Sequence, residues 1–199
     1  MNPSPPLEAL LPVIEALRRL GVPYYLGGSL ASSLYGVART TLDADLVADL
    51  GLAHVAPLVS ALQGAYYVDA GMIAEAITRK SCFNVIHLAT MFKVDVFVLK
   101  DRPYDRTALG RTRQDSLTPE EPGAEVLLAA PEDIILNKLE WFRSGDEVSG
   151  RQWHDAVGVL KVQKDHLDRG YLARWAAELG LTDLLQRAWR EAEGRGAQA

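Results

Sequence analysis

Short apolar or alternating stretches recur through the first two-thirds of the chain, and each is bounded by glycine, proline or polar residues. This pattern is typical of β-strands. The predicted strands are residues 22–26, 42–47, 65–68, 82–88, 93–99 and 125–129. Only the four residues Ala89-Thr90-Met91-Phe92 separate the strands at 82–88 and 93–99, which predicts a hairpin.

Helical spacing of apolar residues predicts helices at 7–20, 29–35 and 54–62, and again throughout the last 70 residues. Pro131-Glu132-Asp133 is typical of a helix start, with proline first and acids in the first turn. Ser149-Gly150-Arg151-Gln152 has the form of a capping box and predicts another helix start. Two further helices are expected at 167–179 and 182–193. The polar segment 101–122, with its prolines, is predicted to be an arm or linker.

This order of elements predicts an α+β fold: a small mixed β-sheet with flanking helices, followed by a helical C-terminal lobe. We expect a first domain at residues 1–125 and the helical lobe at 126–199. The chain has 199 residues, of which 48% are hydrophobic and 24% are charged. That composition is typical of a globular protein with a sizeable core.

Cys82 is the only cysteine, so no intrachain disulfide can form, which fits a reducing compartment. The first twenty residues lack the basic start of a signal peptide, and no stretch is apolar enough for a membrane span. We therefore expect a soluble cytoplasmic protein without a membrane partner. The net charge of −5 argues against a stable DNA complex. Four arginines are nonetheless close together in the sequence, and a local basic patch stays open: Arg102, Arg106, Arg111 and Arg113.

Two acidic residues, Asp43 and Asp45, alternate with apolar residues on one predicted strand, so both project to the same face. Asp95 has the same relation to its apolar neighbours on a later strand. If the two strands are neighbours, three carboxylates converge, and a divalent cation would relieve their repulsion. Oxygen ligands at this spacing favour Mg²⁺ or Mn²⁺ over zinc. Taken alone, the same pattern is also typical of a solvated strand face, and that alternative stays open.

Gly27-Gly28-Ser29 stands between a predicted strand and a predicted helix. A glycine turn at a helix start presents backbone N–H groups and the positive end of the helix dipole, which suits a phosphate. The spacing is that of neither a P-loop nor a dinucleotide-binding turn. What strengthens the interpretation is the order along the chain: strand, glycine turn, helix, Arg39 and then Asp-x-Asp. A phosphate site beside a metal site is the chemistry of nucleotidyl transfer.

The stretch from Tyr24 to Val47, with fourteen positions from Ser29 to Asp43 and a third acid at Asp95, resembles the signature of the polymerase-β-type nucleotidyltransferase superfamily. The resemblance implies the nucleotidyltransferase fold for the first domain and a nucleoside triphosphate (NTP) as substrate. It further implies that the three aspartates bind the metal and carry the catalysis. Gly27, Gly28, Ser29 and Arg39 would then bind the phosphates.

Three further segments, FNVIHLATMFKVDVFVL, EDIILNKLEWFRSGDEVSGRQWHDAVGVLK and YLARWAAELG, resemble the bacterial AbiEii-type nucleotidyltransferases, which act as toxins of toxin–antitoxin pairs. This resemblance implies active-site roles for Lys138 and Asp155. On periodicity, Lys138 falls near the centre of an apolar helix stripe, where an ammonium needs an anionic partner unless it extends out to solvent. Asp155 lies beside its helix stripe, and a surface ion pair with Arg151 is the alternative.

The predicted activity is therefore Mg²⁺-dependent transfer of a nucleoside monophosphate to an acceptor. By resemblance the acceptor is an RNA, in particular a tRNA 3′ end, and a cognate antitoxin is the expected protein partner. Transfer to a protein or small-molecule hydroxyl would use the same residues. A third alternative is a non-catalytic member of the fold that binds a nucleotide or a partner protein.

Overall fold

The computed structural model describes residues 5–117 and 125–194, which group into two compact units. The sheet unit comprises Met1–Gly27 and Thr40–Leu128, and the helical unit comprises Gly28–Arg39 and Ala129–Ala199. The chain therefore passes between the units at three points. These units differ from the predicted ranges 1–125 and 126–199 mainly in that residues 28–39 group with the C-terminal helices.

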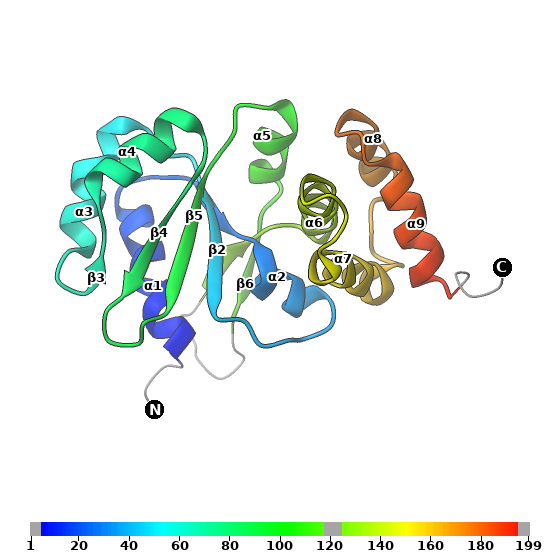
Figure 1. Ribbon diagram of the computed structural model, residues 1–199, viewed down its shortest axis with the longest axis horizontal. Coiled ribbons are helices and arrows are strands. Elements are labelled where there is room, and N and C mark those ends of the chain that lie inside the picture. Colours follow the sequence, from blue (N-terminus) through cyan, green and yellow to red (C-terminus); the bar gives the residue numbers. More distant parts are fainter. Residues whose placement is uncertain (1–4, 118–124, 195–199) are drawn as a thin grey trace. The chain divides into compact units, whose positions relative to one another are not determined.

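The described part of the sheet unit contains a seven-stranded sheet of order β3-β4-β5-β2-β1-β7-β6 (Figure 1). Its strands are β1 (Tyr24–Leu26), β2 (Asp43–Ala48), β3 (Tyr66–Tyr67), β4 (Cys82–His87), β5 (Lys93–Val98), β6 (Arg113–Ser116) and β7 (Glu125–Leu128). The β2–β5 and β1–β7 pairs are parallel, and the other neighbouring pairs are antiparallel. The sheet is thus mixed, as the sequence predicted.

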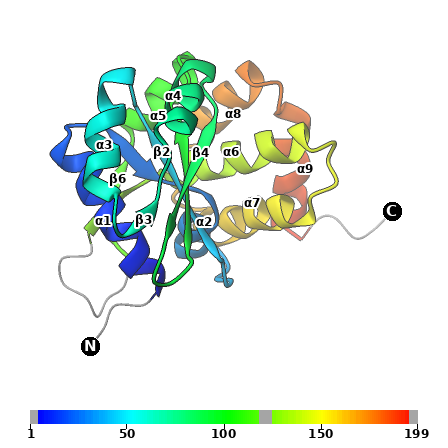
Figure 2. The same ribbon diagram turned by 60° about the vertical axis from the view of Figure 1, so that its left-hand side comes forward.

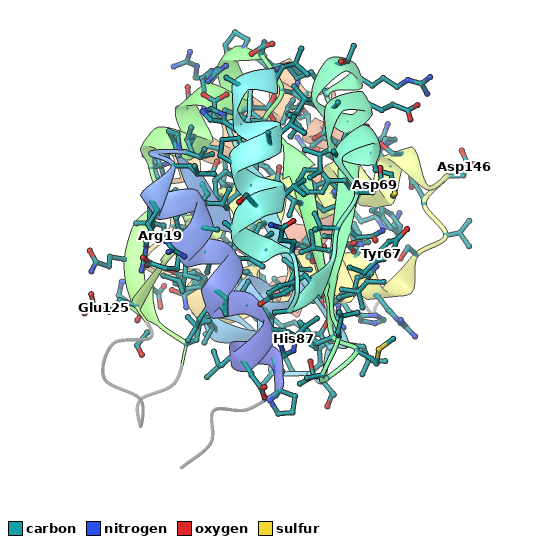
Figure 3. The ribbon with its side chains drawn as sticks, turned by 90° about the vertical axis from the view of Figure 1, so that its left-hand side faces the viewer. Arg19, Tyr67, Asp69, His87, Glu125 and Asp146 are labelled. Atoms are coloured by element: carbon teal, nitrogen blue, oxygen red, sulfur yellow. The ribbon has the colours of Figure 1, made fainter. Side chains whose placement is uncertain are left out.

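Helices α1 (Pro5–Arg19), α3 (Val55–Leu62) and α4 (Ala70–Arg79) cover one face of this sheet (Figures 1 and 2). Figure 3 shows these three helices side by side, with Arg19 at the end of α1 and Asp69 just before α4. Burial alternates along both β2 and β5. The buried residues are Ala44, Leu46, Ala48, Val94, Val96 and Val98. Because a strand alternates its side chains, the polar residues between them lie on the opposite face.

The helical unit consists of α2 (Gly28–Tyr35), α6 (Pro131–Ser144), α7 (Gly150–Gln163), α8 (Arg169–Glu178) and α9 (Thr182–Ala192) among its described residues. Figure 2 shows α6 and α7 running alongside each other, and α2 packs against both. The chain leaves α2 at Gly36, where an added Cβ would lie 2.9 Å from both Ser32 O and Val159 N. Only glycine therefore fits between α2 and α7 at this point.

Two sequence interpretations were wrong in detail. The predicted arm at 101–122 contains the helix α5 (Pro103–Gly110) and the strand β6, while its residues 118–122 lie outside the described part of the chain. The helix α4 was not predicted at all, although the Asp69 side chain caps it by accepting a hydrogen bond from Met72 N at 2.7 Å. Ser149 precedes α7 as predicted, but its side chain makes no capping hydrogen bond.

Across the described residues, no helix combines the length and the apolar character needed to cross a membrane.

Candidate active site

The predicted acidic residues share one face of the sheet unit. Strands β2 and β5 are parallel neighbours, with Asp45 directly opposite Asp95 and Asp43 directly opposite Lys93. All four side chains alternate with buried apolar residues, so they lie on the face opposite the one that α1, α3 and α4 cover. The sequence analysis left open whether these two strands are neighbours, and in the structure they are.

Lys93 is a part of this acidic group that the sequence interpretation missed. Its Nζ lies 2.6 Å from Asp95 Oδ2 and 3.8 Å from Asp43 Oδ2. The hydrogen bond to Asp95 raises the pKa of Lys93, against the opposing effect of its partial burial. Thr41 Oγ1 donates a hydrogen bond of 2.9 Å to Asp43 Oδ1 and fixes that carboxylate further. The alternation that identified Asp95 also placed Lys93 on the same face, so the signal was present in the sequence.

The donor set of Asp43, Asp45 and Asp95 has the chemistry that Mg²⁺ and Mn²⁺ prefer, since all its atoms are carboxylate oxygens. In the described part of the chain, however, no three His, Cys, Asp or Glu side chains are arranged so that they could hold a metal ion. Lys93 Nζ supplies the positive charge between Asp43 and Asp95. The three carboxylates therefore have the donor type that a divalent cation prefers, but in this arrangement Lys93, and not a metal site, lies between them.

Strand β4 extends this polar face. Asn84 lies directly opposite Asp95, and Cys82 lies opposite Phe97. Burial raises the pKa of the Cys82 thiol to about 12, and the negative charges of Asp95 and Asp45 act in the same direction. The thiol is therefore protonated at neutral pH and is a poor nucleophile.

A second charged group lies within the helical unit, where two cations share the carboxylate of Asp155. Arg39 makes a two-pronged contact, with Nε 2.9 Å from Oδ1 and Nη2 3.0 Å from Oδ2. Lys138 Nζ lies 2.8 Å from Oδ2, and the side chains of Lys138 and Asp155 are each 6% exposed. Lys138 therefore does not extend to solvent, and Asp155 is buried in contact with Arg39 and Lys138 rather than forming the surface pair considered above.

The protonation of Asp155 follows from these contacts. Burial alone would raise the pKa of the carboxyl group, but the hydrogen bonds from Arg39 and Lys138 outweigh it and hold the pKa below its ordinary value. Asp155 is thus an ionised carboxylate in contact with the side chains of Arg39 and Lys138. Two positively charged side chains therefore share one carboxylate in this group.

Ser29 connects this group to the start of α2. Arg39 Nη2 donates a hydrogen bond to Ser29 Oγ, and Ser29 is 9% exposed. Gly28 begins the helix with a φ of +58°, a conformation that favours glycine. The first N–H groups of an α-helix have no partner within the helix, so the start of α2 suits an anion. Gly27 differs, because its N–H donates to Asp45 O at 2.8 Å inside the sheet unit.

Two arginines of the predicted basic cluster form ion pairs with neighbouring carboxylates. Arg102 Nε lies 2.6 Å from Asp105 Oδ2, and Arg106 pairs with both Asp49 and Asp101. Two of the four arginines are therefore held in ion pairs within the sheet unit.

The fold is that of the nucleotidyltransferases, as the sequence predicted. An antigenic nucleotidyltransferase-like protein from Paracoccidioides brasiliensis superposes with a TM-score of 0.50 at 17% identity, covering 94% of this chain and 93% of that chain. The lincosamide antibiotic adenylyltransferase LnuA, solved with lincomycin bound, is also similar (TM-score 0.47, 13% identity, 78% and 96% coverage). So is the antibiotic-resistance factor ANT(2'')-Ia (TM-score 0.49, 17% identity, 94% and 95% coverage).

No protein-family profile and no curated protein sequence matches the chain. At 17% identity, the likeness to the Paracoccidioides brasiliensis protein establishes the fold alone. The narrower AbiEii-type resemblance stays a prediction.

Proposed function

We propose that the protein is a nucleotidyltransferase that moves a nucleoside monophosphate from an NTP to an acceptor hydroxyl and releases pyrophosphate. The observation that carries this proposal is the register of β2 and β5, which sets Asp45 beside Asp95 and adds Asp43 on the same face of a nucleotidyltransferase fold. Adjacent carboxylates on one rigid sheet are suited to hold a cation that phosphoryl chemistry requires.

In the sheet unit, Asp43, Asp45 and Asp95 would hold Mg²⁺ or Mn²⁺. The chemistry that such a cation supplies when bound is neutralisation of the charge that develops on the phosphates. Asp95 would also accept the proton of the acceptor hydroxyl on a carboxylate oxygen. Before a cation binds, Lys93 would balance the charge of Asp95 and Asp43, which it contacts here. When the cation binds, the flexible side chain of Lys93 would turn away from them.

In the helical unit, Lys138 and Arg39 would neutralise the triphosphate. The presence of two cationic side chains in this group, and the contact of Arg39 with Ser29 at the start of α2, support that role. Gly28 and Ser29 would offer backbone N–H groups to the terminal phosphates, with Gly27 shaping the turn. Asp155 would act as a positioning residue, since it fixes both cations through hydrogen bonds.

For the acceptor we propose an RNA hydroxyl, such as that of a tRNA 3′ end, in a toxin controlled by a cognate antitoxin. The support is the AbiEii-type resemblance of the segments quoted above. The ion pairs of Arg102 and Arg106 argue against those two residues as the RNA path. In the experiment that follows, label in protein or in a small molecule would indicate one of those acceptors. Nucleotide binding without label in any acceptor would indicate a non-catalytic member of the fold.

The test is incubation of the protein with each α-labelled NTP, Mg²⁺ and, separately, total RNA, protein extract and small polyols or aminoglycosides. We expect label in the RNA, and a loss of roughly a hundredfold or more in Asp45→Asn, because the metal contributes several kcal/mol. Asp165→Asn, an exposed aspartate on the helical unit, is the matched control. Undiminished Mg²⁺-dependent transfer by the Asp43→Asn, Asp45→Asn double variant would refute the mechanism.

A further inference from the structure

Lys93 places a cation of the protein itself among the three carboxylates of the sheet unit. Its Nζ donates a hydrogen bond of 2.6 Å to Asp95 Oδ2 and lies 3.8 Å from Asp43 Oδ2. This hydrogen bond is the main reason why the pKa of Lys93 is raised, and the negative charges of all three carboxylates add to the effect. Lys93 therefore neutralises part of the charge of this face.

The contacts of Lys93 can be broken without disturbing the core of the sheet unit. The side chains of Lys93 and Asp43 are 41% and 39% exposed, and the two residues begin the strands β5 and β2. The long stem of a lysine also lets its ammonium reach water. Lys138 differs, because its side chain and that of its partner Asp155 are each only 6% exposed. Of these two lysines, Lys93 can leave its carboxylates more readily.

A divalent cation and the ammonium of Lys93 need the same carboxylate oxygens. Mg²⁺ and Mn²⁺ bind to oxygen atoms, and Asp43 and Asp95 are the residues whose oxygens Lys93 contacts. A free cation can therefore bind there only after the charge-assisted hydrogen bond from Lys93 to Asp95 is broken. A triphosphate removes this disadvantage, because its oxygens are new anionic partners for the displaced ammonium.

We propose that Lys93 couples the binding of the divalent cation to the binding of the NTP. Lys93 competes with a free cation for Asp43 and Asp95. It leaves these carboxylates when the cation arrives with a triphosphate, to which its ammonium then binds. This inference rests on the proposed function and adds to it the residue that selects the metal–nucleotide complex over the free metal ion. Such a coupling is a difference between two affinities, so both have to be measured.

The first experiment titrates the full chain with Mn²⁺ alone and measures binding by calorimetry and by the electron paramagnetic resonance signal of free Mn²⁺. Lys93→Met should bind Mn²⁺ about 10- to 100-fold more tightly than the native protein, because no charge-assisted hydrogen bond has to be broken. Lys93→Arg keeps the positive charge and should stay close to the native affinity. Lys100→Met, at an exposed lysine of the same unit, is the matched control and should change nothing.

Two further measurements locate the cation and separate competition from a purely structural role. Adding Asp95→Asn to Lys93→Met should abolish the gain in Mn²⁺ affinity. In EDTA, Lys93→Met should melt below the native protein, because Asp43 and Asp95 then repel each other. Mn²⁺ should raise the melting temperature of Lys93→Met more than that of the native protein. A structural role alone would lower the melting temperature without this recovery.

The second experiment measures the binding of Mn²⁺ complexed with an excess of an α,β-methylene NTP analogue, which cannot transfer its nucleotidyl group. In the native protein Lys93 exchanges one anionic partner for another, so Lys93→Met should change the affinity for this complex by less than about threefold. The preference of the native protein for the complex over free Mn²⁺ should therefore fall about 10- to 100-fold in Lys93→Met.

Four results would overturn the inference. They are an Mn²⁺ affinity of Lys93→Met equal to or below the native one, a gain that persists with Asp95→Asn, an equal gain for free Mn²⁺ and for the complex, and no binding of the complex by the native protein. The proposed function fails separately. If both titrations behave as expected but no acceptor receives label, the role of Lys93 stands and the transferase proposal falls.

Discussion

Asp155 is a buried carboxylate, and its removal would take away the anion that both Arg39 and Lys138 contact. Lys138 is 5% exposed and cannot reach water without a structural change. We expect Asp155→Ala to lower the free energy of unfolding by about 3–5 kcal/mol, the usual effect of breaking a buried ion pair. Urea denaturation measures it. Asp183→Ala is the matched control, since it breaks an exposed pair with Arg143, and should change little.

The same carboxylate predicts a dependence on pH. In the folded protein its pKa lies below its ordinary value, because the hydrogen bonds from Arg39 and Lys138 outweigh the effect of burial. A depressed pKa contributes stability above the unfolded pKa of about 3.9, and this contribution is lost as pH falls through the folded value. The difference in unfolding free energy between the native protein and Asp155→Asn should be full at pH 7 and shrink below pH 4. A difference that stays constant from pH 7 to pH 3 would contradict this account.

The pKa of the Cys82 thiol depends on the negative charges on its face of the sheet. Cys82 reaches the surface, but neighbouring groups still desolvate its thiol, and this effect, followed by the charges of Asp95 and Asp45, raises its pKa to about 12. Alkylation by iodoacetamide at pH 8 should therefore be slow, because the thiolate is the reactive form. Asp95→Asn removes one negative charge and should speed the reaction, which mass spectrometry follows. Asp165→Asn should leave the rate unchanged, and equal rates in all three proteins would exclude this electrostatic coupling.

For single residues, the sequence was informative where the position of a side chain depends on one strand alone. The alternation in LDADL and KVDVF was enough to put Asp43, Asp45 and Asp95 on polar faces. It also put Lys93 on the same face as Asp95, but the contact of Lys93 with Asp43 depends on the register between two strands, which the alternation does not give. The pairing of Arg39 with Asp155 joins residues 116 positions apart, and no local pattern reports such a contact.

Helices α2 and α7 approach each other so closely at Gly36 that there is no room for a side chain. A Cβ at Gly36 would lie 2.9 Å from backbone atoms of Ser32 and Val159, and backbone cannot move aside as a side chain can. Gly36→Ala should therefore destabilise the protein by about 1–3 kcal/mol. Thermal and urea unfolding measure the effect. Gly110→Ala, with nothing within 4 Å of the new atom, should be neutral or slightly stabilising.

The two helices that were not predicted, α4 and α5, both have sequence features that are typical of helices. In α4, buried Ile73, Ala76 and Ile77 have helical spacing after the capping Asp69. In α5, Pro103 at the start and buried Tyr104 and Ala108 give the same kind of signal, which the polar composition of the segment concealed. Strand β6 is different, because its residues RQDS are mostly exposed and show no apolar alternation. It is a strand because its backbone pairs with β7.

At the scale of the whole molecule, the two compact units do not correspond to two continuous halves of the chain. Residues 28–39 belong to the helical unit, although most of that unit begins at Ala129. The mixed sheet and the helical C-terminal part followed from periodicity, which is a local property. The grouping of α2 with α6 and α7 depends on contacts between distant segments, so the sequence pattern could not supply it.

This division predicts how fragments behave. A fragment of residues 129–199 lacks α2 and would expose the surface of α6 and α7 that α2 covers. It should unfold at lower urea concentration, and less cooperatively, than a fragment in which residues 28–39 are joined to 129–199 by a flexible glycine–serine linker. Circular dichroism follows both transitions. Identical unfolding curves would show that α2 adds nothing to the stability of the helical unit.

The early position of α2 in the chain also has a consequence for synthesis on the ribosome. About 90 residues separate Arg39 from the start of the segment that contains its packing partners. At roughly 5–20 residues per second, α2 leaves the exit tunnel on the order of 4–18 seconds before α6 begins to follow. During that interval the buried side of α2, which carries Ser29, Ala31 and Ser32, has no native surface to pack against. The helical unit can therefore complete its packing only after α6 and α7 have been synthesised.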